Sequence, residues 1–155
     1  MIHMIVGVQG SGKSTFASSL AEKKNIEIVS TDAIRKKYKD IEEYKVWEYV
    51  YKRMAELLKK GKDCIFDATS ITRNVRKRFF DNVSSYGVKV VADCYYLDTD
   101  IDICERRIKE RNLDENELYL PIEVIYSYKE RLEVPSIDEG FTKITVIKNY
   151  SLDNN

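Results

Sequence analysis

Short apolar runs alternate with longer amphipathic stretches along this chain of 155 residues. Several runs are apolar at every position and rich in Val, Ile and aromatic residues, which is typical of strands buried on both faces of a parallel sheet. They predict strands over Met4 to Val8, Glu27 to Ser30, Asp63 to Phe66, Val88 to Leu97 and Lys143 to Lys148.

The stretches between these runs show helical spacing. In the longest of them Val50, Met54 and Leu57 recur at helical intervals, and the glycine at position 61 is a stop signal. The predicted helices cover residues 13–24, 33–39, 42–60, 72–85, 101–111 and 121–133. Strands that alternate with helices indicate an α/β fold, in which helices cover both faces of a parallel sheet.

Composition and charge narrow the class of protein. Lys plus Arg and Asp plus Glu number 26 each, so a nucleic-acid site would have to be a local patch rather than an overall positive field. The cysteines, Cys64, Cys94 and Cys104, are scattered without metal-ligand spacing, so we expect reduced core residues. His3, the one histidine, lies in the first predicted strand and is not expected to be catalytic.

The chain shows no targeting or membrane signal. The first residues predict a strand rather than a signal peptide, and no apolar stretch is long enough to span a membrane. We therefore expect a cytoplasmic domain over residues 1–150, followed by a polar tail over residues 151–155. The sequence carries no signal for an oligomeric state.

The link between the first strand and the first helix matches the phosphate-binding pattern G-x-x-x-x-G-K-[ST] at Gly7, Gly12, Lys13 and Ser14. Glycines let backbone N–H groups converge on phosphate oxygens, and the helix N-terminus adds its dipole. Lys13 can reach the β- and γ-phosphates, and the Ser14 hydroxyl can ligate Mg²⁺. We expect MgATP to be held by Gln9, Gly10, Ser11, Gly12, Lys13, Ser14 and Thr15.

Two acidic residues follow predicted strands. Asp32 comes just after the second strand, and the carboxyl ends of parallel strands meet at one sheet edge, so its carboxylate can accept a proton from an attacking hydroxyl. Arg35, three residues later, can hold an anionic acceptor group. Asp67 ends the third strand, where it can join Ser14 at Mg²⁺. The alternatives are a helix cap at Asp32 or Thr31, a solvated Arg35 and a turn residue at Asp67.

Arginines recur in two later segments. Arg107 and Arg111 are spaced to share one helix face, where they can neutralise the transferring phosphoryl group from a lid over residues 104–121, unless Glu105 or Glu110 pairs with them. In the earlier segment the cations cannot all share one helix face, so one or two can line an anionic-substrate groove and the rest are solvated. These cations are Arg73, Arg76, Lys77 and Arg78.

The ordered set of motifs resembles the 5′-polynucleotide kinases, the kinase modules of polynucleotide kinase–phosphatase enzymes. The shared motifs are GVQGSGKS at residues 7–14, TDAIR at 31–35, FDAT at 66–69, C-x-x-R-x-x-x-R at 104–111 and LPIEVI at 120–125. The resemblance implies a P-loop kinase fold with a five-stranded parallel sheet and a small helical lid. It also implies ATP-dependent transfer to the 5′-hydroxyl of a single-stranded DNA or RNA end.

The same resemblance implies residue roles. Asp32 would be the general base, Arg35 would contact the 3′-phosphate of the terminal nucleotide, and Arg107 and Arg111 would engage ATP phosphates. The sequence departs from the family at Ser70, where Asn is frequent, and in the longer, acidic stretch NLDENELYL at residues 112–120. The stretch LDTDID at residues 97–102 superficially suggests the aspartate pair of a phosphatase, but a second catalytic domain would not fit in the remaining residues, so we expect no phosphatase module in this sequence.

Acceptor specificity is expected in the aromatic segment from Tyr38 to Tyr51, although aromatic residues on an amphipathic helix are more often core. Two other functions stay open. One is a kinase of the same architecture that acts on a sugar, nucleoside or other hydroxylated metabolite. The other is a nucleotide-dependent switch or ATPase without an acceptor, for which the sequence offers no clear water-positioning residue.

Overall fold

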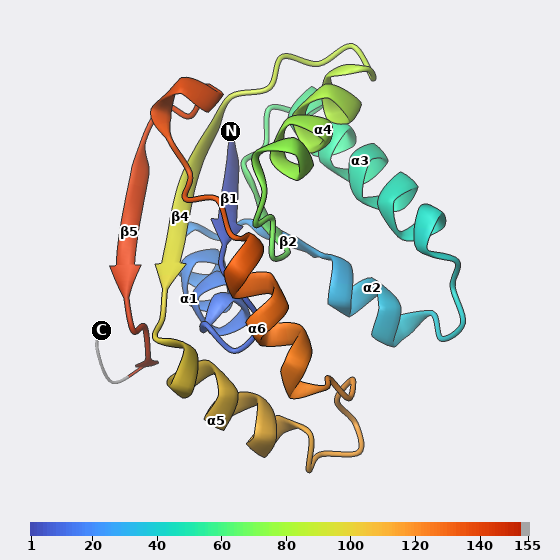
Figure 1. The fold of residues 1–155 in the computed structure, drawn as a ribbon. Coiled ribbons are helices and arrows are strands. Elements are labelled where there is room, and N and C mark those ends of the chain that lie inside the picture. The colour runs from blue at the N-terminus through green and yellow to red at the C-terminus, as the bar shows by residue number, and fades with distance from the viewer. Residues whose placement is uncertain (153–155) are drawn as a thin grey trace.

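The computed structural model describes residues 1–152. A five-stranded parallel sheet runs through it in the order β2-β3-β1-β4-β5, and all strands point toward the end where α5 and α6 lie (Figure 1). The strands are β1 (Ile2–Val6), β2 (Glu27–Ser30), β3 (Cys64–Asp67), β4 (Ala92–Asp98) and β5 (Ile144–Lys148). This topology confirms the predicted α/β fold class.

Helices cover both faces of the sheet, as the alternating pattern predicts. They are α1 (Lys13–Lys24), α2 (Thr31–Lys37), α3 (Glu43–Lys59), α4 (Arg73–Ser84), α5 (Ile101–Arg111), α6 (Ile122–Arg131) and a short 3-10 turn η1 (Ile137–Glu139). None of the helices in residues 1–152 is long and apolar enough to cross a membrane.

Side-chain alternation along the strands divides the core into two layers. Met4 and Phe66 face α3 and α4, where Val50 and Phe79 complete the layer, and the Phe66 and Phe79 rings stack at 4.1 Å between centroids. Ile5, on the other face, packs against α1. A third cluster beyond the strand ends joins α5 and α6 to the loop after β1. The sheet edge that carries the chemistry is therefore enclosed by α5 and α6.

Some strands begin or end at other residues than predicted, because pairing with a strand far away in the sequence determines these ends. β1 ends at Val6 because Gly7 and Val8 turn into the phosphate loop, and β4 begins at Ala92, opposite Ile2, where β1 itself begins. The lid predicted over residues 104–121 comprises most of α5, whose Cys104 is fully buried, and the connection to α6 over residues 112–121. Its role as a lid stays a prediction. The predicted tail, residues 151–155, lies partly outside the described residues.

The cysteines follow the core prediction. Cys64, Cys94 and Cys104 are buried and unpaired. Burial raises the pKa of the Cys64 and Cys94 thiols to about 12, so both are protonated and unreactive at neutral pH.

Candidate active site

The loop between β1 and α1 forms a cradle for an anion. Gly10 and Gly12 have φ values of 79° and 99°, which L side chains rarely adopt, and a Cβ at Gly10 would lie 2.6 Å from the Cys104 carbonyl oxygen. α1 begins at Lys13 without a side-chain cap or an acidic residue in its first turn. Its first N–H groups and its dipole are therefore available to phosphate oxygens.

Lys13 closes this cradle over the sheet edge. Its ammonium group donates to the Val8 carbonyl at 3.3 Å. Burial lowers the pKa of Lys13, whereas the nearby carboxylates of Asp67 and Asp32 raise it. The ammonium group thus lies in the field of both acidic residues, and a bound phosphate would replace the carbonyl as its partner.

Asp67 and Ser14 lie side by side below the cradle. The Ser14 hydroxyl donates to the Asp67 carboxylate at 3.0 Å. Burial raises the pKa of Asp67, with Lys13 and Ser14 opposing the shift. A hydroxyl and a buried carboxylate are hard oxygen ligands, and together with phosphate oxygens and water they fit the coordination of Mg²⁺. The described residues hold no ready cluster of three His, Cys, Asp or Glu side chains, so such a cation would depend on phosphate ligands.

Asp32 enters the same pocket from the neighbouring strand. Ser30 pairs with Asp67 across β2 and β3, and its side chain caps α2 by accepting from the Ala33 N–H at 3.2 Å. The cap is therefore Ser30 rather than Asp32 or Thr31. The Asp32 side chain is 62% exposed and lines one pocket with Lys13, Ser14 and Asp67.

Arg35 is held between two carboxylates. It donates to Asp32 at 2.7 Å and, through Nε, to Glu43 of α3 at 3.2 Å. The hydrogen bond from Arg35 is the main reason that the pKa of Glu43 is lowered. These contacts use one N–H from each of the three guanidinium nitrogens, so two of the five N–H groups have no partner among residues 1–152. Glu43 was not found from the sequence, since its partner lies eight residues away on another helix.

The pocket around these groups has a volume of about 420 Å³. Its far wall comes from the segment before α6 and from α6 itself, including Tyr119, Val124, Tyr128 and Arg131. The Arg131 guanidinium lies 4.6 Å from the centre of the Tyr128 ring. The sequence signal for this wall was the spacing of Val124, Tyr128 and Arg131, which places them on one face of α6.

Of the predicted nucleotide-binding residues, the pocket includes Gln9, Lys13, Ser14 and Arg111. The others lie outside its lining: Gly10, Ser11, Gly12, Thr15 and Arg107. Ser11 instead anchors the loop, because its carbonyl accepts from the Thr99 hydroxyl at 2.8 Å.

The two arginines of α5 have different surroundings, although they are spaced to share one helix face. Arg107 donates to the carbonyls of Gly10 at 3.1 Å and Tyr150 at 2.8 Å, behind the phosphate loop. Arg111 lines the pocket, and its buried Nε has no hydrogen-bond partner among the described residues. Among residues 1–152, neither arginine forms an ion pair with Glu105 or Glu110. Glu105 pairs with Lys109 instead. Arg111 is thus the α5 arginine that faces the pocket.

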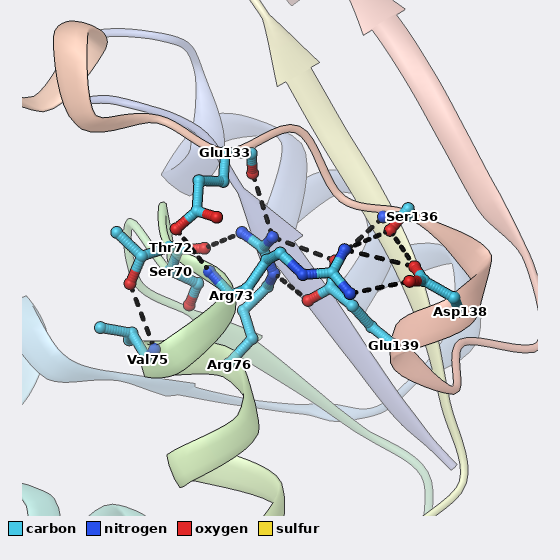
Figure 2. Close-up of polar contacts among 9 residues, drawn as sticks. All are labelled: Ser70, Thr72, Arg73, Val75, Arg76, Glu133, Ser136, Asp138 and Glu139. Carbon is cyan, nitrogen blue, oxygen red and sulfur yellow. Dashed lines mark hydrogen bonds and ion pairs between the residues drawn. The ribbon is translucent and has the colours of Figure 1, made fainter.

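A closed ion-pair network supports the pocket wall after β3. Figure 2 shows Arg76 at its centre, with no exposed surface, bound by Glu139 through hydrogen bonds of 2.7 and 3.1 Å. Arg76 also donates to the carbonyls of Ser70 at 2.8 Å and Glu133 at 3.0 Å. The network joins residues 70–76 to the chain that follows α6. It therefore holds in place the part of the pocket wall that Ser70 and Thr72 form.

The neighbouring cations are used unequally. Arg73 pairs with Asp138 at 2.9 Å (Figure 2). Lys77 pairs with Asp81 at 2.6 Å on an exposed face of α4. The Arg78 side chain has no ion pair or hydrogen bond among residues 1–152. Arg78 is thus the cation of this segment without a partner in residues 1–152, and a role in an anionic-substrate groove stays a prediction. The expectation that the other cations are solvated is wrong for Arg73 and Arg76, which the carboxylates of η1 hold within the fold.

A phosphate-binding loop after the first strand of a five-stranded parallel sheet, covered by α5 and α6, defines a P-loop kinase domain. A family model described as "AAA domain" matches residues 2–135, and the chain belongs to this family. The bifunctional polynucleotide phosphatase/kinase of Schizosaccharomyces pombe is 29% identical over 143 residues, which make up 92% of this chain and 32% of the relative. This chain thus spans about a third of that curated relative.

Solved structures share the fold at low identity. A gluconokinase from Sinorhizobium meliloti has a TM-score of 0.65 at 18% identity, over 96% of this chain and 82% of that chain. Kti12 from Chaetomium thermophilum, in complex with ADP-AlF3, has a TM-score of 0.72 at 13% identity, over 96% of this chain and 89% of that chain. These likenesses establish the architecture and leave the acceptor open.

Proposed function

We propose that this domain transfers the γ-phosphoryl group of ATP to the 5′-hydroxyl of a single-stranded DNA or RNA end. The observation that carries the proposal is that Asp32 and Lys13 line one pocket from the ends of neighbouring elements. A phosphoryl donor held by Lys13 would then lie within the same space as a carboxylate that can accept a proton.

The proposed step uses residues of both walls. The bond between the 5′-oxygen and the γ-phosphorus forms as the bond to the β–γ bridging oxygen breaks, and ADP leaves with that oxygen. The hydroxyl proton passes to the Asp32 carboxylate. Arg111 and Lys13 neutralise the charge on the transferring group. Mg²⁺, held by Ser14 and Asp67, would supply charge neutralisation on the β- and γ-phosphates when bound.

Arg35 supplies acceptor recognition in this proposal. Arg35 lines the pocket together with Asp32, and its two remaining N–H groups would hold the 3′-phosphate of the terminal nucleotide. Glu43 fixes the guanidinium so that the Asp32 carboxylate keeps its position. The named activity of the fission yeast relative supports a polynucleotide acceptor, whereas the fold is equally found in a gluconokinase.

Phosphoryl transfer from labelled ATP with Mg²⁺ tests the proposal. The acceptors are a 5′-hydroxyl oligonucleotide, gluconate and a set of nucleosides, assayed side by side. We expect label on the oligonucleotide. Label on a metabolite alone would favour a small-molecule kinase, and release of phosphate without any labelled acceptor would favour an ATPase.

Asp32→Asn separates transfer from nucleotide binding. We expect it to lower kcat at least about 10²-fold while ATP affinity persists, because the amide cannot accept the proton. Asp40→Asn is the matched control, since Asp40 is exposed, lies outside the pocket and has a positive φ that Asn tolerates. Equal kcat values for the two variants would contradict the role of Asp32.

A further inference from the structure

A second hollow, of about 560 Å³, adjoins the candidate active site between α3 and α4. It shares Trp47 and Val75 with the active-site pocket, so these two side chains border both spaces. We call this hollow the α3–α4 groove and define it by Tyr44, Trp47, Tyr51, Val75, Arg78 and Tyr86. The two hollows are therefore neighbours, and an acceptor longer than one nucleotide could contact both of them.

Aromatic rings line the groove from both helices. Tyr44, Trp47 and Tyr51 lie three and four residues apart, on one face of α3, and the Trp47 and Tyr51 ring centres are 5.8 Å apart. Tyr44 is 56% exposed, and Tyr86, beyond the end of α4, is 40% exposed. Tyr38 and Tyr49 line a different depression. The structure thereby selects particular rings from the aromatic segment for an acceptor.

Arg78 is the cation that lines the groove, while Lys45, outside its lining, lies 5.9 Å from the centre of the Tyr44 ring. Arg78 is exposed, lacks an ion pair among the described residues and lies close enough to Tyr51 that its charge lowers the pKa of that phenol against the larger, raising effect of burial. Glu48 also lines the groove and disfavours a second phosphate there. The groove therefore fits one phosphate flanked by flat rings, which describes a single nucleotide better than a duplex backbone.

We propose that the α3–α4 groove binds the nucleotide that follows the terminal nucleotide of the acceptor, with its base on Tyr44 or Trp47 and its phosphate at Arg78. The inference rests on the proposed function and specifies its substrate as an oligonucleotide rather than a mononucleotide. Stacking on a ring accepts any base, so the groove would add affinity with little sequence preference.

Steady-state kinetics with two acceptors test the groove. A nucleoside 3′-monophosphate fills the pocket alone, whereas a 5′-hydroxyl tetranucleotide also reaches the groove. We expect the wild-type KM to be about tenfold lower for the tetranucleotide than for the nucleoside 3′-monophosphate. A tenfold change lies in the lower part of the range of affinities that stacking one base on an aromatic ring adds. Tyr44→Ala and Arg78→Ala should each remove most of this difference. Lys77→Ala, next to Arg78 but paired with Asp81, should retain it.

Trp47 provides a second readout, because it is the one tryptophan of the chain. We expect the tetranucleotide, without ATP, to quench its fluorescence more strongly than the nucleoside 3′-monophosphate does. If both acceptors are phosphorylated with equal KM and quench alike, the groove proposal is overturned while the proposed function stands. If neither acceptor is phosphorylated and a metabolite is, the proposed function fails and the groove proposal falls with it.

Discussion

Arginines in two regions of this domain have opposite surroundings. In the network around Arg76, every guanidinium finds carboxylate or carbonyl partners within the fold. Along the pocket and the groove, Arg111 keeps a buried Nε without a partner, and Arg78 has no ion pair among residues 1–152. A buried donor without a partner costs free energy, so the Arg111 Nε fits a site that an anionic ligand completes, whereas the exposed Arg78 is hydrated until a ligand binds.

The comparison shows that the number and spacing of cations in the sequence do not tell an arginine that stabilises the fold from one that is available to a ligand. Arg73, Arg76 and Arg78 stand within six positions of one helix, yet two of them hold the fold and one faces an open groove. What separates them is the carboxylates of η1, which reach Arg73 and Arg76 alone. Substitution of the buried Arg76 should therefore change stability, and substitutions of Arg111 or Arg78 should change activity.

The largest expected effect is on stability, at Arg76. Arg76→Ala removes the bidentate partner of the buried Glu139 carboxylate and leaves it only the Ser136 N–H and a longer contact with Arg73. Loss of one partner of a buried ion pair costs about 3–5 kcal/mol of the free energy of unfolding. Urea unfolding followed by circular dichroism measures it. Arg73→Ala is the control from the same network, because both Arg73 and Asp138 are largely exposed and little change is expected. Equal losses for the two variants would contradict the assignment.

Arg111 should show the opposite result. Arg111→Ala should lower kcat about 10²–10³-fold, the size seen when one preorganised donor to a developing charge is removed, and leave the unfolding midpoint nearly unchanged. Arg106→Ala is the matched control, since Arg106 is exposed on the same helix and lies outside the pocket. A large loss of stability with unchanged kcat would make Arg111 a structural residue like Arg76.

Asp67 gives a pH-dependent test of the open region. Because burial raises its pKa, a proton competes with a cation for this carboxylate at higher pH than at an ordinary aspartate. The Mg²⁺ concentration for half-maximal activity should therefore rise as pH falls, by up to about tenfold per pH unit once pH is below that pKa. Asp67→Asn should require far more Mg²⁺ and lose this pH dependence. The same pH dependence in both proteins would exclude Asp67 as the titrating group.

The sequence predicts those parts of the fold and site that depend on neighbours along the chain. The helices Lys13–Lys24 and Ile101–Arg111 and the strand Glu27–Ser30 have the predicted bounds, because periodicity and local end signals define them. Asp32 and Asp67 share a pocket, as strand ends in a parallel sheet predict.

Long-range partners explain what the sequence does not predict. Residues 88–91 have strand-like composition, yet β1 begins at Ile2 and pairs from Ala92 onward. Arg107 and Arg111 have the predicted spacing, but the Tyr150 carbonyl, 43 residues away, takes Arg107 out of the pocket. Arg76 finds Glu139 across 63 positions. No local pattern specifies such pairs, because only the packed sheet brings them together.

The smallest expected effect lies where the two regions meet, at Ser70. Arg76 holds the Ser70 carbonyl, and the residue has a φ of 47°, with a buried hydroxyl that lacks a partner among the described residues. Asn tolerates this left-handed backbone better than Ser, and Ser70 lines the pocket, into which the longer side chain would have to extend. Ser70→Asn should therefore raise the free energy of unfolding by about 0.5 kcal/mol. Ser70→Ala keeps the backbone strain and removes only the hydroxyl, so its free energy of unfolding should rise less. A larger rise for Ser70→Ala than for Ser70→Asn would show that the buried hydroxyl, and not the backbone conformation, destabilises the wild-type protein.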